Sequence, residues 1–220
     1  MHTRVFVSET REGQQILVLF YEAACVFSNF YPAEFKIKPV EEREKIERKV
    51  KKDGEKELKF SCSEQYFMYQ KAVLVGDLET ARKIREESNP MKMKVLGRKL
   101  EMSKEQLHKW SQISQEAMYN ACFAKFAQNK DIRAFLFRTH GMKLVEASPS
   151  DTIWGIGPFG KNDKRAENEE TWRGSNWLGK VLDRVRDELW EREEFRSERE
   201  AISAESLETR RQLLEHYFKI

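Results

Sequence analysis

Cysteine and histidine are scarce in this sequence, and their scarcity excludes several kinds of site. The 220 residues contain only 3 Cys and 4 His. The cysteines are odd in number and lie far apart, at Cys25, Cys62 and Cys122, with no CxxC spacing. We therefore expect reduced thiols, and neither a disulfide framework nor a zinc site. Because the histidines are also scattered, a His-based catalytic triad or metal centre has little support.

Long apolar runs and the common catalytic motifs are missing as well. No window approaches the length of a transmembrane helix, and residues 1–15 lack the uninterrupted apolar core of a signal peptide. We expect a soluble protein of the cytoplasm or the nucleus, without a membrane partner. The sequence has no Walker A, GxSxG or HExxH motif. Its net charge of +3 does not by itself predict nucleic-acid binding, which usually requires a concentrated basic face.

What the sequence does contain is enough apolar residues for one core. Hydrophobic residues make up 40% of the chain, and 14 Phe, 5 Trp and 6 Tyr make that core aromatic. Charged residues reach 35% and concentrate at about 40–59 and 184–211. We predict a single domain over residues 1–192 with a charged insertion at about 40–58, and a charged helical extension over residues 193–220.

The hydrophobic patterns predict an α+β fold that is predominantly helical, with a small sheet. Strands are expected at residues 5–7, 16–21 and 142–147. Within the charged insertion, the Asp53-Gly54 pair predicts a hairpin turn, reached by an extended hairpin or by a short helix. Candidate helix caps are Ser63, Asp77 and Ser103. Helices are expected at residues 64–75, 78–88, 91–99, 110–128, 131–138, 176–193 and 198–218.

The most informative of these helices carries the segment SEQYFMYQKA. Glu64, Met68 and Lys71 fall at i, i+4 and i+7, so they share one face of the helix. A carboxylate and an ammonium among aromatic residues would be partly dry, and burial can make Lys a nucleophile or Glu a proton carrier. The alternative is an ordinary amphipathic helix, in which Glu64 interacts with the helix dipole and Lys71 extends into water.

A second candidate is the segment VEASPSDTIWGIG, in which a strand runs into a loop rich in Pro and Gly. Such a position is common for active-site residues. Glu146 and Asp151 provide carboxylates, and Trp154 provides a flat surface on which a base or a sugar can stack. The glycines, Gly155 and Gly157, would let backbone N–H groups approach an anion closely. An ordinary tight turn is the alternative interpretation.

The aromatic segment FSNFYP offers polar groups between rings. Ser28 and Asn29 are candidates to hydrogen-bond a sugar or a nucleobase, while Phe30 and Tyr31 provide stacking surfaces. A local Asx or Ser turn on a packed loop is an equally compatible interpretation.

Two arginines are candidate phosphate ligands. Arg173 lies in WRGSNWLG, where Gly174, Ser175 and Asn176 suit a helix N-terminus, a place that favours anions. Arg98 ends the LGR turn and is the second candidate. Neither motif is specific alone, because an ordinary capped helix start would have the same residues.

Taken in order, these segments resemble the NADAR family (named for NAD and ADP-ribose), also called YbiA-like. The resemblance covers roughly residues 15–190. It rests on FSNFYP, SEQYFMYQKA, LGR, Trp110, NACFAKFAQN, LVEASPSDTIWGIG and WRGSNWLG. The ordered set is more specific than any single motif, and EASPxDxIWGIG is close to diagnostic. The resemblance implies a YbiA-like single domain, whose usual compact form lacks the charged insertion and the tail beyond about residue 192.

The resemblance also implies hydrolysis of N-glycosidic bonds, without a metal or a cofactor. Family members are similar to enzymes that remove ADP-ribose from guanine bases in nucleic acid, and to enzymes that cleave phosphorylated riboflavin-pathway intermediates. We therefore expect an N-glycosidase whose partner is ADP-ribosylated nucleic acid or a small molecule that contains ADP-ribose. The alternatives are a glycosidase for riboflavin-pathway intermediates and a non-catalytic module that binds ADP-ribose or NAD.

On this hypothesis the catalytic residues are Glu64, Lys71 and Asp151. Glu64 is expected nearest the reacting carbon and Asp151 is expected to orient the ribose hydroxyls. Lys71 either attacks the sugar or holds Glu64 and a phosphate in place. The expected substrate-binding residues are Ser28, Asn29, Phe30, Tyr31, Arg98, Glu146, Trp154, Gly155, Gly157, Arg173 and Asn176.

Overall fold

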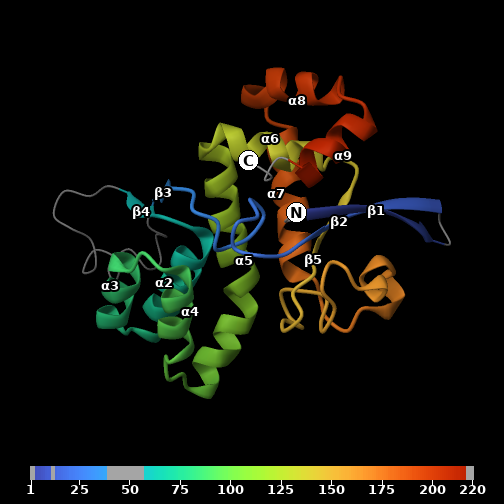
Figure 1. Ribbon diagram of the computed structural model, residues 1–220. Helices are drawn as coiled ribbons and strands as arrows, with labels where there is room; N and C mark the ends of the chain where they lie inside the picture. Colours follow the sequence, from blue (N-terminus) through green and yellow to red (C-terminus); the bar gives the residue numbers. More distant parts are fainter. Residues whose placement is uncertain (1–2, 11–12, 39–56, 217–220) are drawn as a thin grey trace. The chain divides into compact units, whose positions relative to one another are not determined.

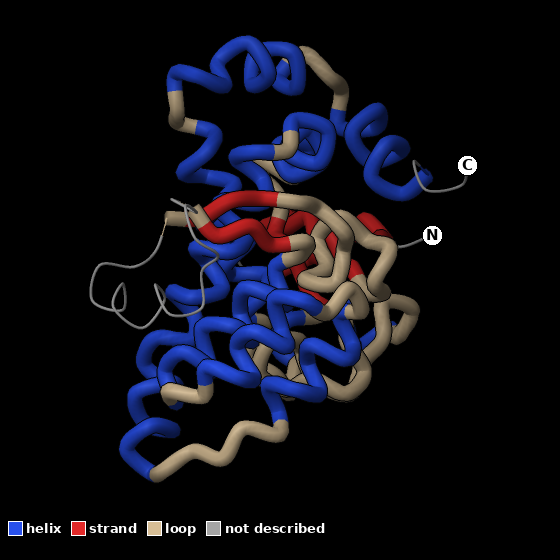
Figure 2. The backbone as a smooth tube through the Cα atoms, turned by 90° about the vertical axis from the view of Figure 1, so that its left-hand side faces the viewer, coloured by secondary structure: helices blue, strands red, loops and turns tan. Residues whose placement is uncertain are grey.

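Helices predominate in the computed structural model, in agreement with the predicted α+β class (Figure 2). The structure describes residues 3–10, 13–38 and 57–216. The chain divides into two compact units. Residues 29–129 form the helical unit, whereas residues 1–28 and 130–220 form the sheet unit. The turn predicted at Asp53-Gly54 lies outside the described residues.

A three-stranded sheet in the order β1-β2-β5 organises the sheet unit (Figure 1). β1 (Thr3–Thr10) and β2 (Gly13–Phe20) form an antiparallel hairpin, and β2 runs parallel to β5 (Lys143–Glu146). Phe20 lies opposite Glu146, so the C-terminal ends of both strands lie side by side at the same end of the sheet. The apolar run at the end of β2 is fully buried, as expected for an inner strand. This sheet confirms the three predicted strands.

Two helices, α6 (Lys130–Arg138) and α7 (Trp177–Trp190), complete the framework around the sheet, and α7 packs on β5. The loop between β5 and α7 contains two short 3-10 turns, η2 (Lys164–Glu167) and η3 (Glu169–Thr171). Its apolar residues join the sheet in one core cluster. The cluster comprises Leu17, Leu19, Val145, Ala147, Ile156, Phe159 and Ala166, with Trp172 packed against it.

The C-terminal segment forms a short 3-10 turn and two helices. These are η4 (Glu193–Phe195), α8 (Arg196–Ser203) and α9 (Leu207–His216). The prediction of one continuous helix over residues 198–218 is therefore wrong. The hydroxyl of Ser206 accepts a hydrogen bond from the N–H of Thr209 at 3.1 Å, so a new helix begins there. Leu207 of the predicted apolar stripe is 49% exposed, whereas Leu214 is buried.

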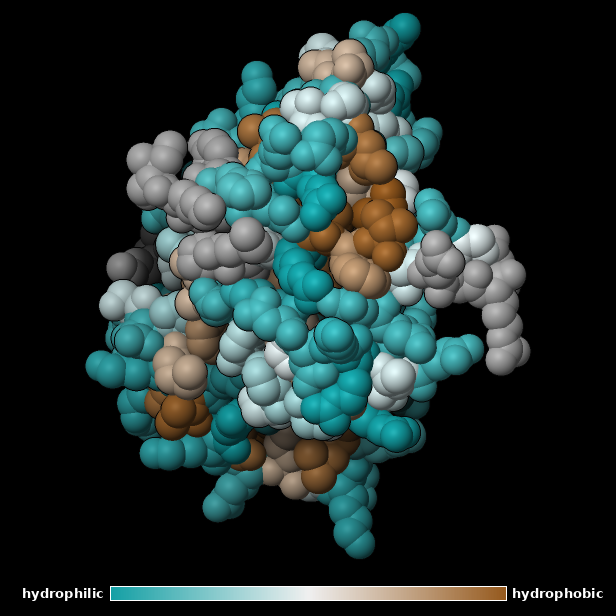
Figure 3. Space-filling model, turned by 45° about the vertical axis from the view of Figure 1, so that its right-hand side comes forward, coloured by the Kyte–Doolittle hydropathy of each residue, from teal (hydrophilic) through white to brown (hydrophobic). Residues whose placement is uncertain are grey.

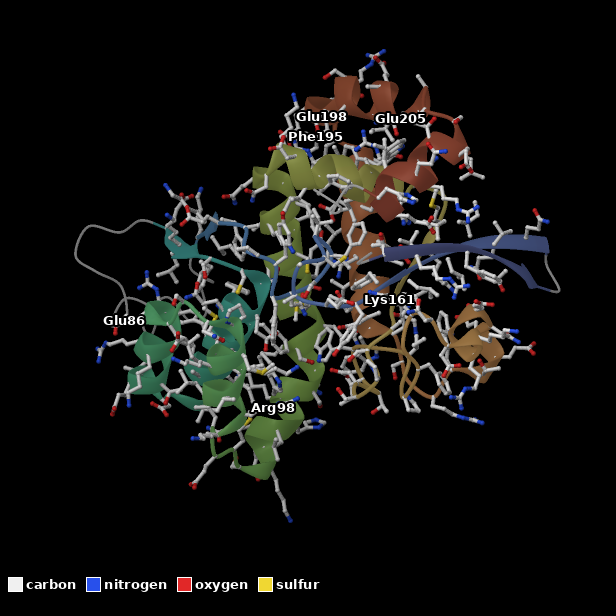
Figure 4. The ribbon with its side chains drawn as sticks, in the orientation of Figure 1. Glu86, Arg98, Lys161, Phe195, Glu198 and Glu205 are labelled. Carbon is white, nitrogen blue, oxygen red and sulfur yellow. The ribbon has the colours of Figure 1, made fainter. Side chains whose placement is uncertain are left out.

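Ion pairs attach α8 and the residues just after it to α6 within the sheet unit. Arg133 forms hydrogen bonds to Glu198 at 3.0 and 2.8 Å, and Arg138 forms a similar pair with Glu205. The ring of Phe195 packs under the guanidinium of Arg133, 4.0 Å from its centroid. Figure 4 shows the three labelled side chains of the C-terminal segment together on this part of the unit. Residues 193–216 are thus a packed part of the sheet unit, and a functional boundary at residue 192 stays a prediction.

The last helix also covers the outer edge of the sheet. Glu215 accepts a hydrogen bond at 2.8 Å from the N–H of Val5, an edge group of β1. The hydroxyl of Thr3 donates to the carbonyl of Leu214. The two ends of the chain are therefore linked through β1 and α9.

Four helices and a small ribbon form the described part of the helical unit. The ribbon pairs β3 (Phe35–Ile37) with β4 (Leu58–Phe60) in antiparallel register. The helices are α2 (Ser63–Val75), α3 (Leu78–Glu86), α4 (Pro90–Arg98) and α5 (Lys104–Gln128). α2 packs against β4 and against each of the other three helices, so it is the central element of this unit.

Local side chains explain most of the helix starts in this unit. Asp77 accepts a hydrogen bond from the N–H of Thr80, as predicted. Ser103 forms a capping box with Gln106, so α5 begins at residue 104 and not at the predicted residue 110. The prediction of Ser63 as a cap is wrong, because the capping position of α2 is taken by Cys62 and makes no side-chain bond.

Exposed large hydrophobic residues are dispersed over the described elements. They are Val7, Tyr21, Met91, Val95, Leu107, Ile153 and Leu207. The face shown in Figure 3 is mostly hydrophilic, with separate hydrophobic patches. In the parts of the chain that the structure describes, no helix is long and apolar enough to cross a membrane.

Candidate active site

The first group of predicted catalytic residues lies on α2, a helix buried on nearly all sides. Ten of its 13 residues are buried, which is unlike a surface helix with one wet face. Phe67 contacts Trp110 of α5 with ring centroids 4.9 Å apart, and Tyr66 meets Phe60 of β4 at 5.1 Å. A charge on this helix is consequently costly and requires an explanation beyond solubility.

Glu64 is placed in the first turn of this helix with only 4% of its surface exposed. Its N–H donates to the carbonyl of Asn29 at 3.0 Å. This bond attaches the start of the helix to residues 29–32, the part of FSNFYP in this unit, which we call the aromatic loop. The positive end of the helix dipole favours a carboxylate here. Both interpretations from the sequence therefore hold in part: Glu64 is a dipole partner, and it is also a buried carboxylate.

Lys71 turns toward the end of α4. Its Nζ donates a hydrogen bond to the carbonyl of Gly97 at 2.9 Å. Burial lowers the pKa of Lys71, and the nearby positive charge of Arg98 lowers it further. The alternative of a lysine extended into water is thus wrong. A lowered pKa increases the fraction of neutral amine, the form that can act as a nucleophile.

Met68 completes the predicted face and explains why α4 approaches α2 so closely. A Cβ added at Gly97 would lie 2.1 Å from the Sδ of Met68, so any larger residue would displace the Met68 side chain. This close approach brings the carbonyl of Gly97 within reach of Lys71. Arg98, the next residue, is exposed at the end of α4, where its side chain projects from the helix (Figure 4).

The aromatic loop of the helical unit contributes three predicted binding residues. Asn29 is buried, and its side-chain oxygen lies 3.9 Å from the Sγ of Cys122. Phe30 and Tyr31 are half-buried. Their rings face cations: Lys94 lies 5.6 Å from the ring of Phe30, and Lys125 lies 5.4 Å from that of Tyr31. The fourth predicted residue, Ser28, belongs to the sheet unit, where its N–H donates to the carbonyl of Cys25.

Asp151 in the sheet unit uses one carboxylate oxygen to shape its own loop. That oxygen accepts hydrogen bonds from the N–H groups of Ile153 at 3.0 Å and Trp154 at 2.7 Å. Trp154 then packs edge-on against Trp177 of α7, with ring centroids 5.6 Å apart. The carboxylate therefore orients the backbone at Trp154, and any role toward a sugar uses its remaining capacity to accept hydrogen bonds.

Backbone hydrogen bonds close this loop around the two glycines. The N–H of Gly157 donates to the carbonyl of Asp151 at 3.1 Å, and that of Ile156 donates to the carbonyl of Glu146 at 3.0 Å. A Cβ on Gly155 would lie 2.8 Å from that same Glu146 carbonyl, and Gly157 has a φ of +101°. The predicted capture of phosphate by the N–H of Gly157 is corrected, because that donor already binds within the loop.

The N-terminus of α7 is closed in the same way. The first N–H groups of this helix donate to loop carbonyls at 3.0–3.2 Å. The pairs are Ser175 to Thr152, Asn176 to Gly155, Trp177 to Ile153 and Leu178 to Trp154. These four donors are satisfied by the chain itself, and the attraction of an anion to this helix start stays a prediction. Arg173 is exposed just before it, and its role as a phosphate ligand stays a prediction.

Asn176 serves the framework. Only 1% of its surface is exposed, and its φ of 49° is unusual for a residue other than glycine. Its carboxamide donates to the carbonyl of Leu144 and accepts from the N–H of Glu146, both at 3.0 Å. The side chain therefore attaches β5 to α7. A direct contact of Asn176 with substrate is an untested prediction, and the structure supplies a positioning role instead.

Lys125 was not among the residues that we predicted for the site. It lies in NACFAKFAQN on α5 and is 1% exposed, although lysine is seldom fully buried. The signal in the sequence was its position beside Phe126 and three residues after Cys122, within the apolar stripe of the helix. Within the described residues, the three cysteines are buried and form no disulfide, and no group of three or more acidic, Cys or His side chains is arranged to hold a metal.

Comparison with known proteins gives consistent matches. Residues 19–190 match the model of the NADAR domain. The chain is similar to protein irg-1 of Caenorhabditis elegans, with 64% identity over 217 residues that cover 99% of both chains. It is 36% identical over 165 residues to N-glycosidase R617 of Acanthamoeba polyphaga mimivirus, covering 74% of this chain and 86% of the relative. The NMR structure of the Escherichia coli protein YbiA superposes with a TM-score of 0.54 and 29% identity, covering 79% of this chain and 84% of that one.

Proposed function

The chain belongs to the NADAR domain family with a YbiA-like fold, as the resemblance implied, and on this basis we propose that it is an N-glycosidase. The relative R617 carries that name, which supports hydrolysis of an N-glycosidic bond. One observation from the structure carries the proposal: a buried helix has the carboxylate of Glu64 two turns from the amine of Lys71, whose pKa is lowered. A module that only binds ADP-ribose has no need for this pair.

The proposed chemistry follows from the charge that develops on the sugar. As a nucleobase leaves ribose C1, positive charge builds on C1 and the ring oxygen, and an acid must protonate the departing nitrogen. A carboxylate close to C1 stabilises that state, and we assign this role to Glu64. Asp151 is assigned to the ribose hydroxyls. Its loop-facing oxygen is already bound, so its other oxygen would accept from the sugar.

Lys71 has two candidate roles in this reaction. As a nucleophile, its neutral amine bonds to C1 while the bond to the base breaks, and the ammonium so formed passes one of its two protons to the departing base. The bond from C1 to the ring oxygen then opens to give an imine, with a proton going to that oxygen, and water hydrolyses the imine to return the amine. In the other role, Lys71 stays charged and only holds Glu64 and a phosphate. Its lowered pKa favours the nucleophile.

A charge-preserving substitution separates these roles. Arginine keeps the positive charge but does not act as a nucleophile. We expect Lys71→Arg to reduce turnover at least about 100-fold. Borohydride should also trap a reduced sugar adduct on Lys71 of the wild-type protein, detected by mass spectrometry. Lys92→Arg, at an exposed lysine of α4, is the matched control. Near-normal turnover of Lys71→Arg, without an adduct, would leave only the holding role.

We favour ADP-ribosylated guanine in nucleic acid as the substrate. Exposed Arg98 and Arg173 suit a diphosphate, and half-buried Phe30 and Trp154 offer rings for stacking on a base. The purified protein should release ADP-ribose and leave intact guanine in a modified oligonucleotide, measured by mass spectrometry. Glu64→Gln is the inactive control. Cleavage of a phosphorylated riboflavin-pathway intermediate, with no action on the oligonucleotide, would show that the metabolite is the substrate. Binding of ADP-ribose without cleavage of either compound would overturn the proposal that the protein is an enzyme.

A further inference from the structure

Two buried charges stand out in the helical unit. Among its described residues, Glu64 and Lys125 are the charged side chains with less than a tenth of their surface exposed, at 4% and 1%. They have opposite signs. Because burying an isolated charge is very costly, buried charged groups in proteins are paired or compensated by polar groups. The presence of one anion and one cation in this unit suggests that they compensate each other.

The aromatic loop connects the two positions through short contacts. The carbonyl of Asn29 accepts from the N–H of Glu64 at 3.0 Å, and the side chain of Asn29 reaches the Sγ of Cys122 at 3.9 Å. Lys125 follows Cys122 by three residues on α5, so both lie on the same face of that helix. The Nζ of Lys125 lies 5.4 Å from the ring of Tyr31, two residues beyond Asn29. The loop thus extends from the start of α2 to the ammonium.

The thiol of Cys62 responds to both charges. Burial raises the pKa of Cys62, the carboxylate of Glu64 raises it further, and the ammonium of Lys125 lowers it. Both charges are therefore close enough to this one sulfur to act on it with little screening. Since Cys62 directly precedes α2, this places the charge of Lys125 near the end of the helix that carries Glu64.

Other titratable groups near α2 are less suited to neutralise a carboxylate. Tyr66, Tyr69 and Lys71 lie on the helix itself and Cys62 directly precedes it, whereas Tyr31, Lys94 and Cys122 lie in the aromatic loop or in contact with it. Two of these are cations, and both are partly exposed: Lys71 is bound to the carbonyl of Gly97, and Lys94 lies over Phe30. Water screens exposed charges far more than buried ones. Among the described residues of this unit, Lys125 is the buried cation, so its charge is the least screened by water.

We infer that Lys125 is a positioning residue that keeps Glu64 ionised and oriented toward the reacting sugar. This inference rests on the proposed glycosidase function, in which the ionised carboxylate of Glu64 stabilises the positive charge on the sugar. Lys125 itself is not assigned any contact with substrate. Its Nζ lies 5.1 Å from the ring centroid of Phe126 and 5.4 Å from that of Tyr31, so aromatic rings flank the ammonium.

Two neutral variants and one charged variant test the inference by activity. Lys125→Met removes the charge at similar length, Lys125→Gln serves if the first fails to fold, and Lys125→Arg restores the charge. In the neutral variants the carboxyl of Glu64 should be protonated at a higher pH, so the acidic limb of the pH profile of kcat should move up by about one pH unit or more. Lys125→Arg should move it back. Lys109→Met, at an exposed lysine of the same helix, is the control.

A measurement without substrate separates this inference from the proposed function. Glutamate labelled with carbon-13 at the carboxyl allows NMR titration of Glu64, with the signal assigned by its loss in Glu64→Gln. Titration at higher pH in Lys125→Met than in the wild type supports the inference, even if no glycosidase activity is found. An unchanged titration in folded Lys125→Met and Lys125→Gln overturns it, even if the protein is an active glycosidase.

Discussion

Helix α2 and the loop between β5 and α7 both carry polar residues of the predicted site, but they use them differently. On α2, Glu64 is buried and Lys71 is half-buried, on a helix that makes most of its backbone bonds internally. In the loop, Asp151 and Gly157 form bonds within the loop, and Asn176 attaches β5 to the start of α7. Similar residue types therefore have different roles. We expect catalytic residues on α2, whereas most of the polar residues in the loop maintain its conformation.

The largest effect should come from removing the charge on α2. Glu64→Gln keeps the shape of the side chain but not its charge, so kcat should fall about 10²- to 10⁴-fold. Thermal stability should fall only modestly, because the amide fills the same space but leaves the buried ammonium of Lys125 without its anion. Kinetics and a melting curve measure the two. Glu86→Gln, at an exposed carboxylate of α3, is the control. A large loss of stability together with activity would show that Glu64 serves the fold, which would remove the contrast with the loop.

An intermediate effect is expected at Asp151, where one side chain serves both purposes. In Asp151→Asn the amide oxygen can still accept from the N–H groups of Ile153 and Trp154, so the loop should keep its shape. Loss of the charge toward the ribose should lower kcat/KM by about 10-fold or more. Asp151→Ala removes both functions and should be worse. Wild-type kinetics in Asp151→Asn, with loss only in Asp151→Ala, would make Asp151 another purely structural residue of the loop.

The smallest effect on turnover should come from Asn176. Asn176→Gly tolerates the positive φ but leaves the carbonyl of Leu144 and the N–H of Glu146 buried without this partner. Unfolding in urea should show a loss of about 2–6 kcal/mol, at about 1–3 kcal/mol for each of the two groups. Below its melting temperature, the variant should retain kcat within a few-fold. Normal stability with lost activity would instead place Asn176 in the binding site.

Much of the fold follows from local sequence signals. The strands, the cap at Asp77 and the break before α4 were predicted because each depends on residues close in sequence. The start of α5 was placed too late, since the capping box at Ser103 satisfies its first N–H groups and outweighs the polar residues that follow. The ribbon of β3 and β4 was missed, because three-residue strands separated by the charged insertion carry no period that a sequence reveals.

In the candidate site, the spacing of residues along a helix was more predictable than their tertiary contacts. The face of Glu64, Met68 and Lys71 follows from helical spacing, and the structure confirms it. The hydrogen bonds that occupy Gly157 and Asn176 depend on tertiary partners at the end of β5, which no local pattern specifies. Lys125 was missed for a similar reason: a lysine next to apolar helix positions is normally assigned to the surface, and its burial depends on packing.

The bonds between α9 and β1 have a consequence for aggregation. An edge strand with unpaired N–H groups is a template on which another chain can add a strand. Glu215 occupies the N–H of Val5, and the hydroxyl of Thr3 is tied to the carbonyl of Leu214, so the helix shields this edge of the sheet. A protein shortened after residue 192 would expose it. Such a truncated chain should self-associate through β1. By covering this strand, α9 thus protects the protein from aggregation.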